Sequence, residues 1–163
     1  MRYVLAVTTF LFAGFLLAQS TPKAPAADLN QLMRGLFFPH SNVVFDTQRH
    51  NPAEIKPAPE PSASPDPLTG IFGGWTAVEN SALLLIDGSD LLMTPGRTCS
   101  NGKPVPIQNA DWIKMVDDLR AAGKVAYEAA KAKNIDKMFD ASDVLNVACA
   151  NCHNKYRRAV RCQ

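Results

Sequence analysis

Apolar residues recur at intervals of three and four in four stretches of the chain, and this spacing is the feature that most limits its fold. The stretches cover residues 28–38, 75–93, 110–134 and 136–158. Residues three and four apart lie on one side of an α-helix, so each stretch predicts an amphipathic helix. No stretch alternates apolar and polar residues for long enough to predict a strand. We therefore expect an all-α protein, an antiparallel up-down-up-down four-helix bundle.

Several residues mark where these helices begin, end or weaken. Asp28 and Asn109 are of the type that caps helix N-termini, and each directly precedes a predicted helix. Pro39 is expected to interrupt the first helix, with a turn or two resuming after it, and Pro95 is expected to end the second. Gly88 is expected to weaken or bend the second helix.

The first twenty residues have the pattern of a secretory signal. Arg2 precedes an apolar run that is short for a membrane span and ends in small residues suited to cleavage. A membrane anchor is the alternative interpretation. We expect residues 1–20 to be removed, residues 21–27 to be a disordered lead, and residues 28–163 to form one domain with a proline-rich loop at 49–74. Export without a permanent anchor predicts the periplasm of a bacterium.

The charge balance is nearly even, with 17 basic and 15 acidic residues. Such a balance gives no indication of nucleic-acid binding.

Residues 149–153 read CANCH and lie on the apolar side of the last predicted helix. Because Cys149, Cys152 and His153 are three and four apart, their side chains project from one face. The spacing C-x-x-C-H is the signature of c-type haem attachment, in which two thiols add to the vinyl groups of the porphyrin and the histidine ligates the iron. The last helix is therefore predicted to carry the haem.

Two other interpretations of CANCH stay open. A redox dithiol of the thioredoxin type would follow a strand in a βαβ pattern, which the sequence does not predict. A zinc site would need Cys99 and Cys162 as its remaining ligands, far from the ligand spacing usual for structural zinc.

The stretch CANCHNKYR at 149–157, at the end of the last of four helices, resembles the class II cytochromes c, the family of cytochromes c′ and their low-spin relatives. The resemblance covers most of the mature chain, but only this stretch is specific. It implies a four-helix bundle, one covalent haem c, and one-electron transfer rather than enzymatic turnover. The proline-rich loop and an extra cysteine pair depart from the family's form, so a homodimer of the usual kind stays open.

The residue opposite His153 decides what the iron can do. Low-spin members of the family use a methionine on the first helix, and LMRG at 32–35 is the match here, so the resemblance gives the distal position to Met33. The alternative is that Met33 fills the core and Leu32 blocks the distal side. An iron left five-coordinate would bind small gases such as nitric oxide or carbon monoxide, which is the alternative function.

The remaining methionines and histidines are expected to have no role at the iron. Met93, Met115 and Met138 are predicted to pack in the core, and His40 and His50 are predicted to be exposed.

The C-terminal segment is basic. Arg157 follows His153 by about one helical turn, close enough to lie beside the haem, and Lys155, Arg158 and Arg161 add positive charge. One interpretation is a docking surface for a redox partner with an acidic face. The other is a solvated helix end whose cations suit the helix dipole.

Cys99 and Cys162 remain outside CANCH. In an up-down-up-down bundle the second loop and the end of the fourth helix lie at the same end, which makes these two cysteines a disulfide candidate. Two free thiols are the alternative.

Overall fold

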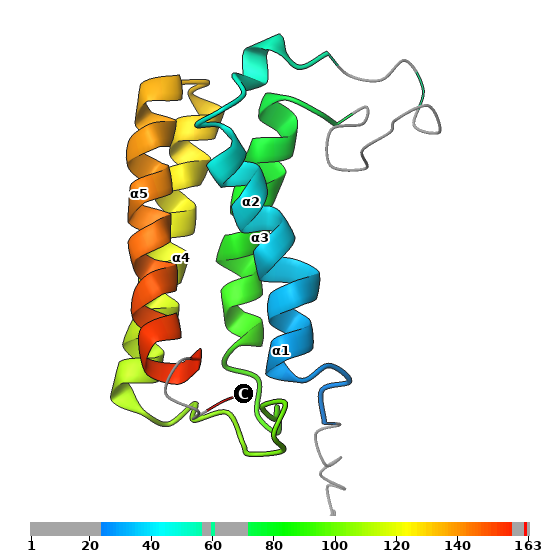
Figure 1. Cartoon of the computed structure of the whole chain (residues 1–163), viewed down its shortest axis with the longest axis vertical. Helices are drawn as coiled ribbons and strands as arrows, with labels where there is room; N and C mark the ends of the chain where they lie inside the picture. Colours follow the sequence, from blue (N-terminus) through cyan, green and yellow to red (C-terminus); the bar gives the residue numbers. More distant parts are fainter. Residues whose placement is uncertain (1–23, 57–59, 61–71, 158–161, 163) are drawn as a thin grey trace, which may run out of the picture.

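The computed structural model describes residues 24–56, 60, 72–157 and 162, which form a bundle of helices (Figure 1). In chain order the elements are α1 (Leu29–Leu32), the π-helical turn η1 (Met33–Phe37), α2 (Phe38–Asp46), the 3-10 turn η2 (Pro52–Glu54), α3 (Trp75–Leu91), α4 (Ala110–Lys131), α5 (Ile135–Cys152) and the π-helical turn η4 (His153–Arg157). The all-α prediction is therefore confirmed over these ranges, where the one departure is an isolated bridge between Thr98 and Pro104. The predicted signal at 1–20 and most of the loop at 49–74 lie outside the described residues.

The first helix begins at a capping box. The Gln31 amide N–H donates to Asp28 Oδ1 at 2.7 Å, and the Asp28 amide donates to Gln31 Oε1 at 2.9 Å. These bonds satisfy donors that a helix N-terminus leaves unpaired, so the prediction of Asp28 as a cap is confirmed. Asn109 stands at the N-cap of α4, but its side chain makes no capping bond there.

The prediction that Pro39 interrupts the first helix is wrong. Segments α1, η1 and α2 follow one another without a break, and the Phe38 amide donates to the Met33 carbonyl five residues earlier. Proline has no amide donor, and in a regular α-helix its ring meets the carbonyl of the preceding turn. The wider π-helical turn before Pro39 relieves that clash, so the helix continues through the proline.

Helices α3 and α4 pack closely because small residues line their contact. A methyl group on Gly123 of α4 would lie 3.0 Å from Ile86 Cγ1 of α3, and Ala122 and Ala126 are fully buried. Gly88 has a similar role toward η1, since a methyl there would lie 2.7 Å from Leu36 Cδ2. Helix α3 runs unbroken through Gly88, so this glycine admits a neighbour rather than breaking the helix.

The core lies along the axis of the bundle. Its large, almost fully buried apolar side chains come from four helices and include Val44, Leu85, Trp112, Met138 and Leu145. Burying a side chain of this size stabilises a fold by roughly 1.5–3 kcal/mol.

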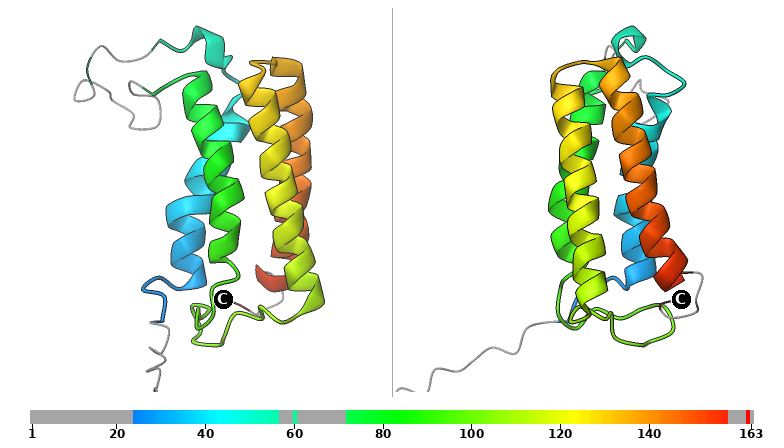
Figure 2. Two further views of the ribbon diagram at one scale, coloured as in Figure 1. Left: turned by 180° about the vertical axis from the view of Figure 1, so that it is seen from behind. Right: turned by 90° about the vertical axis from the view of Figure 1, so that its left-hand side faces the viewer.

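One end of the bundle gathers segments that are far apart in the sequence (Figure 2). The Leu29 amide at the start of α1 donates to the Thr98 carbonyl at 2.8 Å, and Trp112 Nε1 at the start of α4 donates to the Leu92 carbonyl after α3 at 3.3 Å. A disulfide joins Cys99 of the α3–α4 loop to Cys162, which follows η4, with their Cα atoms 4.9 Å apart. The stretch CANCH, at 149–153, also lies at this end.

Candidate functional site

Two cysteines on the last turn of α5 form the centre of the candidate site. Cys149 and Cys152 are both unbonded, half-buried and packed against the apolar core. They continue a stripe whose earlier members, Leu145 and Ala148, are buried. The amphipathic pattern of α5 therefore directs both sulfurs toward the interior rather than to open solvent.

His153 opens the π-helical turn η4 immediately after these cysteines and is half-buried. Tyr156, in the same turn, is buried with 5% of its surface exposed. The turn that carries the histidine is thus attached to the core by the residue three positions further on.

The electrostatics of the two thiols disfavour redox-dithiol chemistry. Burial raises the pKa of Cys149. Burial also raises the pKa of Cys152, to about 11, and the nearby side chains of Cys149 and Asp111 add to this increase. Catalytic dithiols instead have a thiol whose pKa is depressed, because the thiolate is the nucleophile. At neutral pH both cysteines here are neutral thiols.

The disulfide removes the ligands that a zinc site would need. Cys99 and Cys162 are bonded to each other, so neither has a thiolate to offer to CANCH. Within the described ranges no group of three or more histidine, cysteine, aspartate or glutamate side chains is placed to hold a metal ion. Zinc bound by these four cysteines is therefore excluded as an interpretation of the motif.

Met33 lies on the first helix, where it opens the π-helical turn η1. Its side chain is half-buried and packs against the core, while its neighbour Leu32 is buried with 8% exposure. Both residues that the sequence offered for the distal position thus belong to the apolar side of this helix.

Asp111, in the first turn of α4, connects to the turn that carries His153. Its Oδ1 accepts the Tyr156 hydroxyl at 2.8 Å, and its Oδ2 pairs with the Lys155 ammonium. Lys155, followed by the Tyr156 hydroxyl, holds the pKa of Asp111 below its ordinary value. The carboxylate is also close enough to Cys152 to raise the pKa of that thiol.

The other sequence candidates are placed as follows. His40 is half-buried, its Nδ1 lies 3.2 Å from Ser81 Oγ, and burial lowers its pKa, so the prediction that it is exposed is wrong. The helix that continues through Pro39 turns His40 toward α3. His50 is exposed, as predicted, and bonds to Asp46 at 2.9 Å.

The methionines predicted to pack in the core do so. Met138 is fully buried, and Met93 and Met115 are half-buried against the core. Arg157 is exposed at the end of η4.

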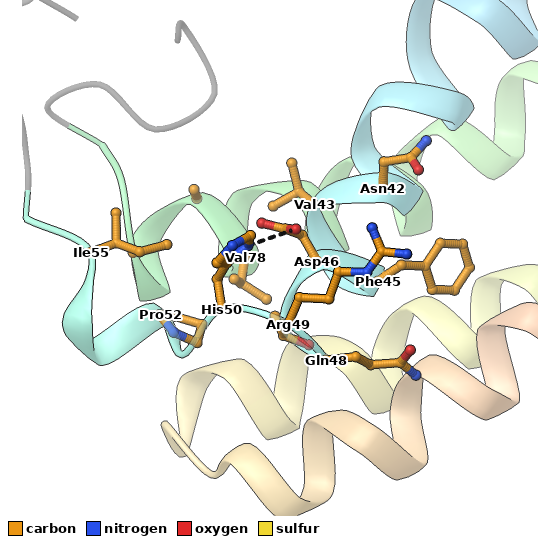
Figure 3. A pocket seen from close by; sticks show the side chains of 13 residues that line it. Asn42, Val43, Phe45, Asp46, Gln48, Arg49, His50, Pro52, Ile55 and Val78 are labelled. Carbon is orange, nitrogen blue, oxygen red and sulfur yellow. Dashed lines mark hydrogen bonds and ion pairs between the residues drawn. The ribbon is translucent and has the colours of Figure 1, made fainter. Parts of the chain in front are cut away.

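A hollow lies at the other end of the bundle, between the end of α2, η2 and the start of α3 (Figure 3). Its volume is about 550 Å³, and Val43, Ile55 and Val78 form part of its wall. The His50–Asp46 pair lies in it, as the dashed line in Figure 3 shows. The hollow is separate from CANCH and shares no residue with it.

Two residues at the site end were missed by sequence reasoning. Asp111 in a first helical turn reads as an ordinary partner of the helix dipole, and nothing in the sequence connects it to Tyr156. Arg97 is buried with 6% exposure, where its Nε donates to the Leu91 carbonyl at 3.0 Å and its guanidinium reaches the Ala27 carbonyl. Its position in a loop gave no signal of this burial.

The chain matches no family model, no curated protein and no solved structure. In the ranges that the structure describes, every helix is too short or too polar to cross a membrane.

Proposed function

We propose that this protein is an exported monohaem c-type cytochrome that carries single electrons through a covalently bound haem iron. One observation carries the proposal. Cys149 and Cys152 are unpaired, half-buried and neutral beside His153, while the chain's other two cysteines are bonded to each other. In an exported chain, where thiols normally oxidise, this division of four cysteines fits attachment of haem c.

The donor set fits the group. Cys149 and Cys152 would form the two thioethers, and His153 would be the proximal ligand of the iron. Their half-buried position on the core side of α5 would shield the iron ligand from water and leave one edge of the haem accessible to a redox partner. The bound haem would supply an iron that cycles between the ferrous and ferric states. Arg157 would place a positive charge near it.

The antiparallel up-down-up-down order is part of this proposal. It is supported by the contacts that gather the start of α1, the end of α3, the start of α4 and the end of α5 at one end. It is also supported by the path of the chain, since blue to cyan and orange to red run in opposite directions in Figure 1.

The register between the first and last helices supports Met33 as the distal ligand. Buried Ser142 of α5 donates its hydroxyl to the Val44 carbonyl of α2 at 3.3 Å. His153 follows Ser142 by eleven residues, and Met33 precedes Val44 by eleven. Eleven residues of α-helix rise roughly 16 Å, so in antiparallel helices both residues would lie near the same level along the bundle.

Both proposed axial ligands open π-helical turns. Met33 begins η1 and His153 begins η4. Such turns shift side chains away from their α-helical directions and are frequent at functional sites. The two irregular turns therefore lie where the proposal needs side chains to turn toward a shared centre.

The resemblance to class II cytochromes c completes the proposal. We propose export to the periplasm, no permanent membrane anchor, redox proteins as partners, no nucleic-acid binding and no enzymatic turnover. The basic end of the chain around Lys155 and Arg157 would suit a partner with an acidic face. We also propose that the protein can form a homodimer.

The visible spectrum of the ferrous protein, with and without carbon monoxide, tests the electron-transfer role. We expect a low-spin spectrum that carbon monoxide leaves unchanged, and conversion of Met33→Leu to a high-spin form that binds the gas. Met93→Leu is the matched control, because Met93 also packs against the core at half exposure and should keep the wild-type spectrum. A high-spin, carbon monoxide-binding wild type would favour the gas-binding function instead.

A further inference from the structure

The first turn of α4 holds the π-helical turn η4, and the contacts fall directly after His153. Asp111 uses both carboxylate oxygens, one for the Tyr156 hydroxyl at 2.8 Å and one for the Lys155 ammonium. Lys155 and Tyr156 follow His153 by two and three residues. A single side chain of another helix is therefore attached to two points of the turn η4.

The attachment continues into the core through Trp112, the residue next to Asp111. Its ring meets the Tyr156 ring edge-on, with centroids 4.9 Å apart and planes at 83°. Trp112 is 1% exposed, and its Nε1 donates to the Leu92 carbonyl after α3 at 3.3 Å. Tyr156 is thus fixed at its hydroxyl and at its ring, and the contact is more rigid than a surface ion pair.

The backbone of Tyr156 has a further partner, since its carbonyl accepts the Cys162 amide at 3.2 Å. His153 belongs to the same turn, so a fixed Tyr156 leaves the Cα–Cβ direction of His153 little freedom. An iron ligand needs this constraint, because the direction of an imidazole sets how well its nitrogen meets the metal.

We propose that Asp111 is a positioning residue for His153, which it orients by holding Lys155 and Tyr156. The role rests on the proposed function, because an oriented imidazole matters only where it ligates iron. Asp111 acts through these two residues, which follow the histidine in the same turn. Without its carboxylate, η4 loses its ionic contact with α4, and the histidine samples a wider range of directions.

Asp118→Asn is the matched control for Asp111→Asn. Asp118 also lies on α4 and pairs with a lysine, Lys114, at 2.7 Å, but that pair stays within one helix. Both variants remove one half-buried carboxylate charge from α4, and Asp111→Asn also removes the contacts with Lys155 and Tyr156 of η4. Tyr156→Phe is the second test variant, because it keeps the ring against Trp112 and loses only the hydroxyl.

The first measurement is hydrogen exchange of the full chain made without haem. We expect the amides of residues 153–157 to exchange roughly tenfold faster in Asp111→Asn than in the wild type, and Asp118→Asn to match the wild type. Tyr156→Phe should accelerate the same amides. Equal exchange in Asp111→Asn and Asp118→Asn would overturn the claim that Asp111 orders this turn.

The second measurement is electron paramagnetic resonance of the ferric, haem-loaded protein, whose g values depend on the orientation of the axial imidazole. We expect shifted, broadened g values in Asp111→Asn, a smaller shift in Tyr156→Phe, and none in Asp118→Asn. In the variant that combines Asp111→Asn with Tyr156→Phe, the g-value shift should be smaller than the sum of the two single shifts, because both residues act through one contact. A coloured Asp111→Asn protein with wild-type g values would overturn the positioning role and leave the cytochrome assignment intact, whereas a wild type without haem would overturn both.

Discussion

The disulfide between Cys99 and Cys162 ties the α3–α4 loop to the end of the chain, so its removal tests how the site end of the bundle is held. Cys162→Ala breaks the cross-link and leaves the buried sulfur of Cys99 in place, which is 2% exposed. The cross-linked residues are 63 positions apart in the sequence. In the chain-entropy model a loop of this length contributes about 4 kcal/mol to the free energy of unfolding.

This loss is large beside the total stability of a domain, which is about 5–15 kcal/mol. Equilibrium unfolding in urea measures it: we expect the midpoint of Cys162→Ala to fall by roughly 2 M, with the slope against urea increased by the expansion of the unfolded chain. Wild-type protein with its disulfide reduced is the control, and should unfold near the variant's midpoint. Thiol exchange is suppressed by working at about pH 6, where few thiols ionise.

A shift of less than about 1 kcal/mol in Cys162→Ala would refute the reasoning, because it would mean that the cross-link does not restrict the unfolded chain as the loop length requires. Unequal stability of reduced wild type and Cys162→Ala would show that the alanine acts through lost packing instead.

Three further predictions concern packing and charge. Gly123→Ala should destabilise the fold by roughly 1–3 kcal/mol, because the added methyl would lie 3.0 Å from a side chain of α3. Gly35 has nothing within 4 Å of the position of an added methyl, so Gly35→Ala should stabilise the fold by up to about 1 kcal/mol. Equal urea midpoints for the two variants would contradict this. Leu145→Ala should lower the free energy of unfolding by roughly 2–5 kcal/mol, because Leu145 is fully buried. Val147 is 57% exposed, so Val147→Ala should lower it by less than about 0.5 kcal/mol in the same assay. Similar losses in the two variants would contradict this difference in burial. The partners of Asp111 hold its pKa below the ordinary value, so wild type should be more stable than Asp111→Asn above about pH 4. This difference should disappear as the pH falls through the folded-state pKa of Asp111. Unfolding across a pH series checks this, and a difference that does not change with pH would refute it.

Helical periodicity was enough to predict the elements of the bundle, because long amphipathic stretches have one stable arrangement, with their apolar sides together. The structure gives α3 and α4 within a few residues of the predicted stretches. The prediction from local sequence was wrong at Pro39, where the preceding turn is π-helical rather than α-helical. Pro39 reads as a break in any isolated segment, whereas in the structure a π-helical turn precedes it, with Leu36 and Phe37 close to Gly88 of α3.

Of the candidate site, the sequence predicts only the CANCH stretch itself. CANCH indicates which thiols and which imidazole lie together, because Cys152 and His153 follow Cys149 by three and four residues and so share its side of a helix. The residues that hold this motif come from elsewhere in the chain. Asp111 and Trp112 reach Tyr156 only once α4 packs against α5, and such contacts carry no short-range sequence pattern.

The intact mass of the acid-denatured mature protein, purified from a bacterium with haem-ligation machinery, tests the cytochrome assignment most directly. The account predicts a mass greater than that of the polypeptide by one haem, with Cys149→Ala or Cys152→Ala removing one thioether and the double variant losing the group. A colourless wild type whose mass equals that of the polypeptide alone would contradict it.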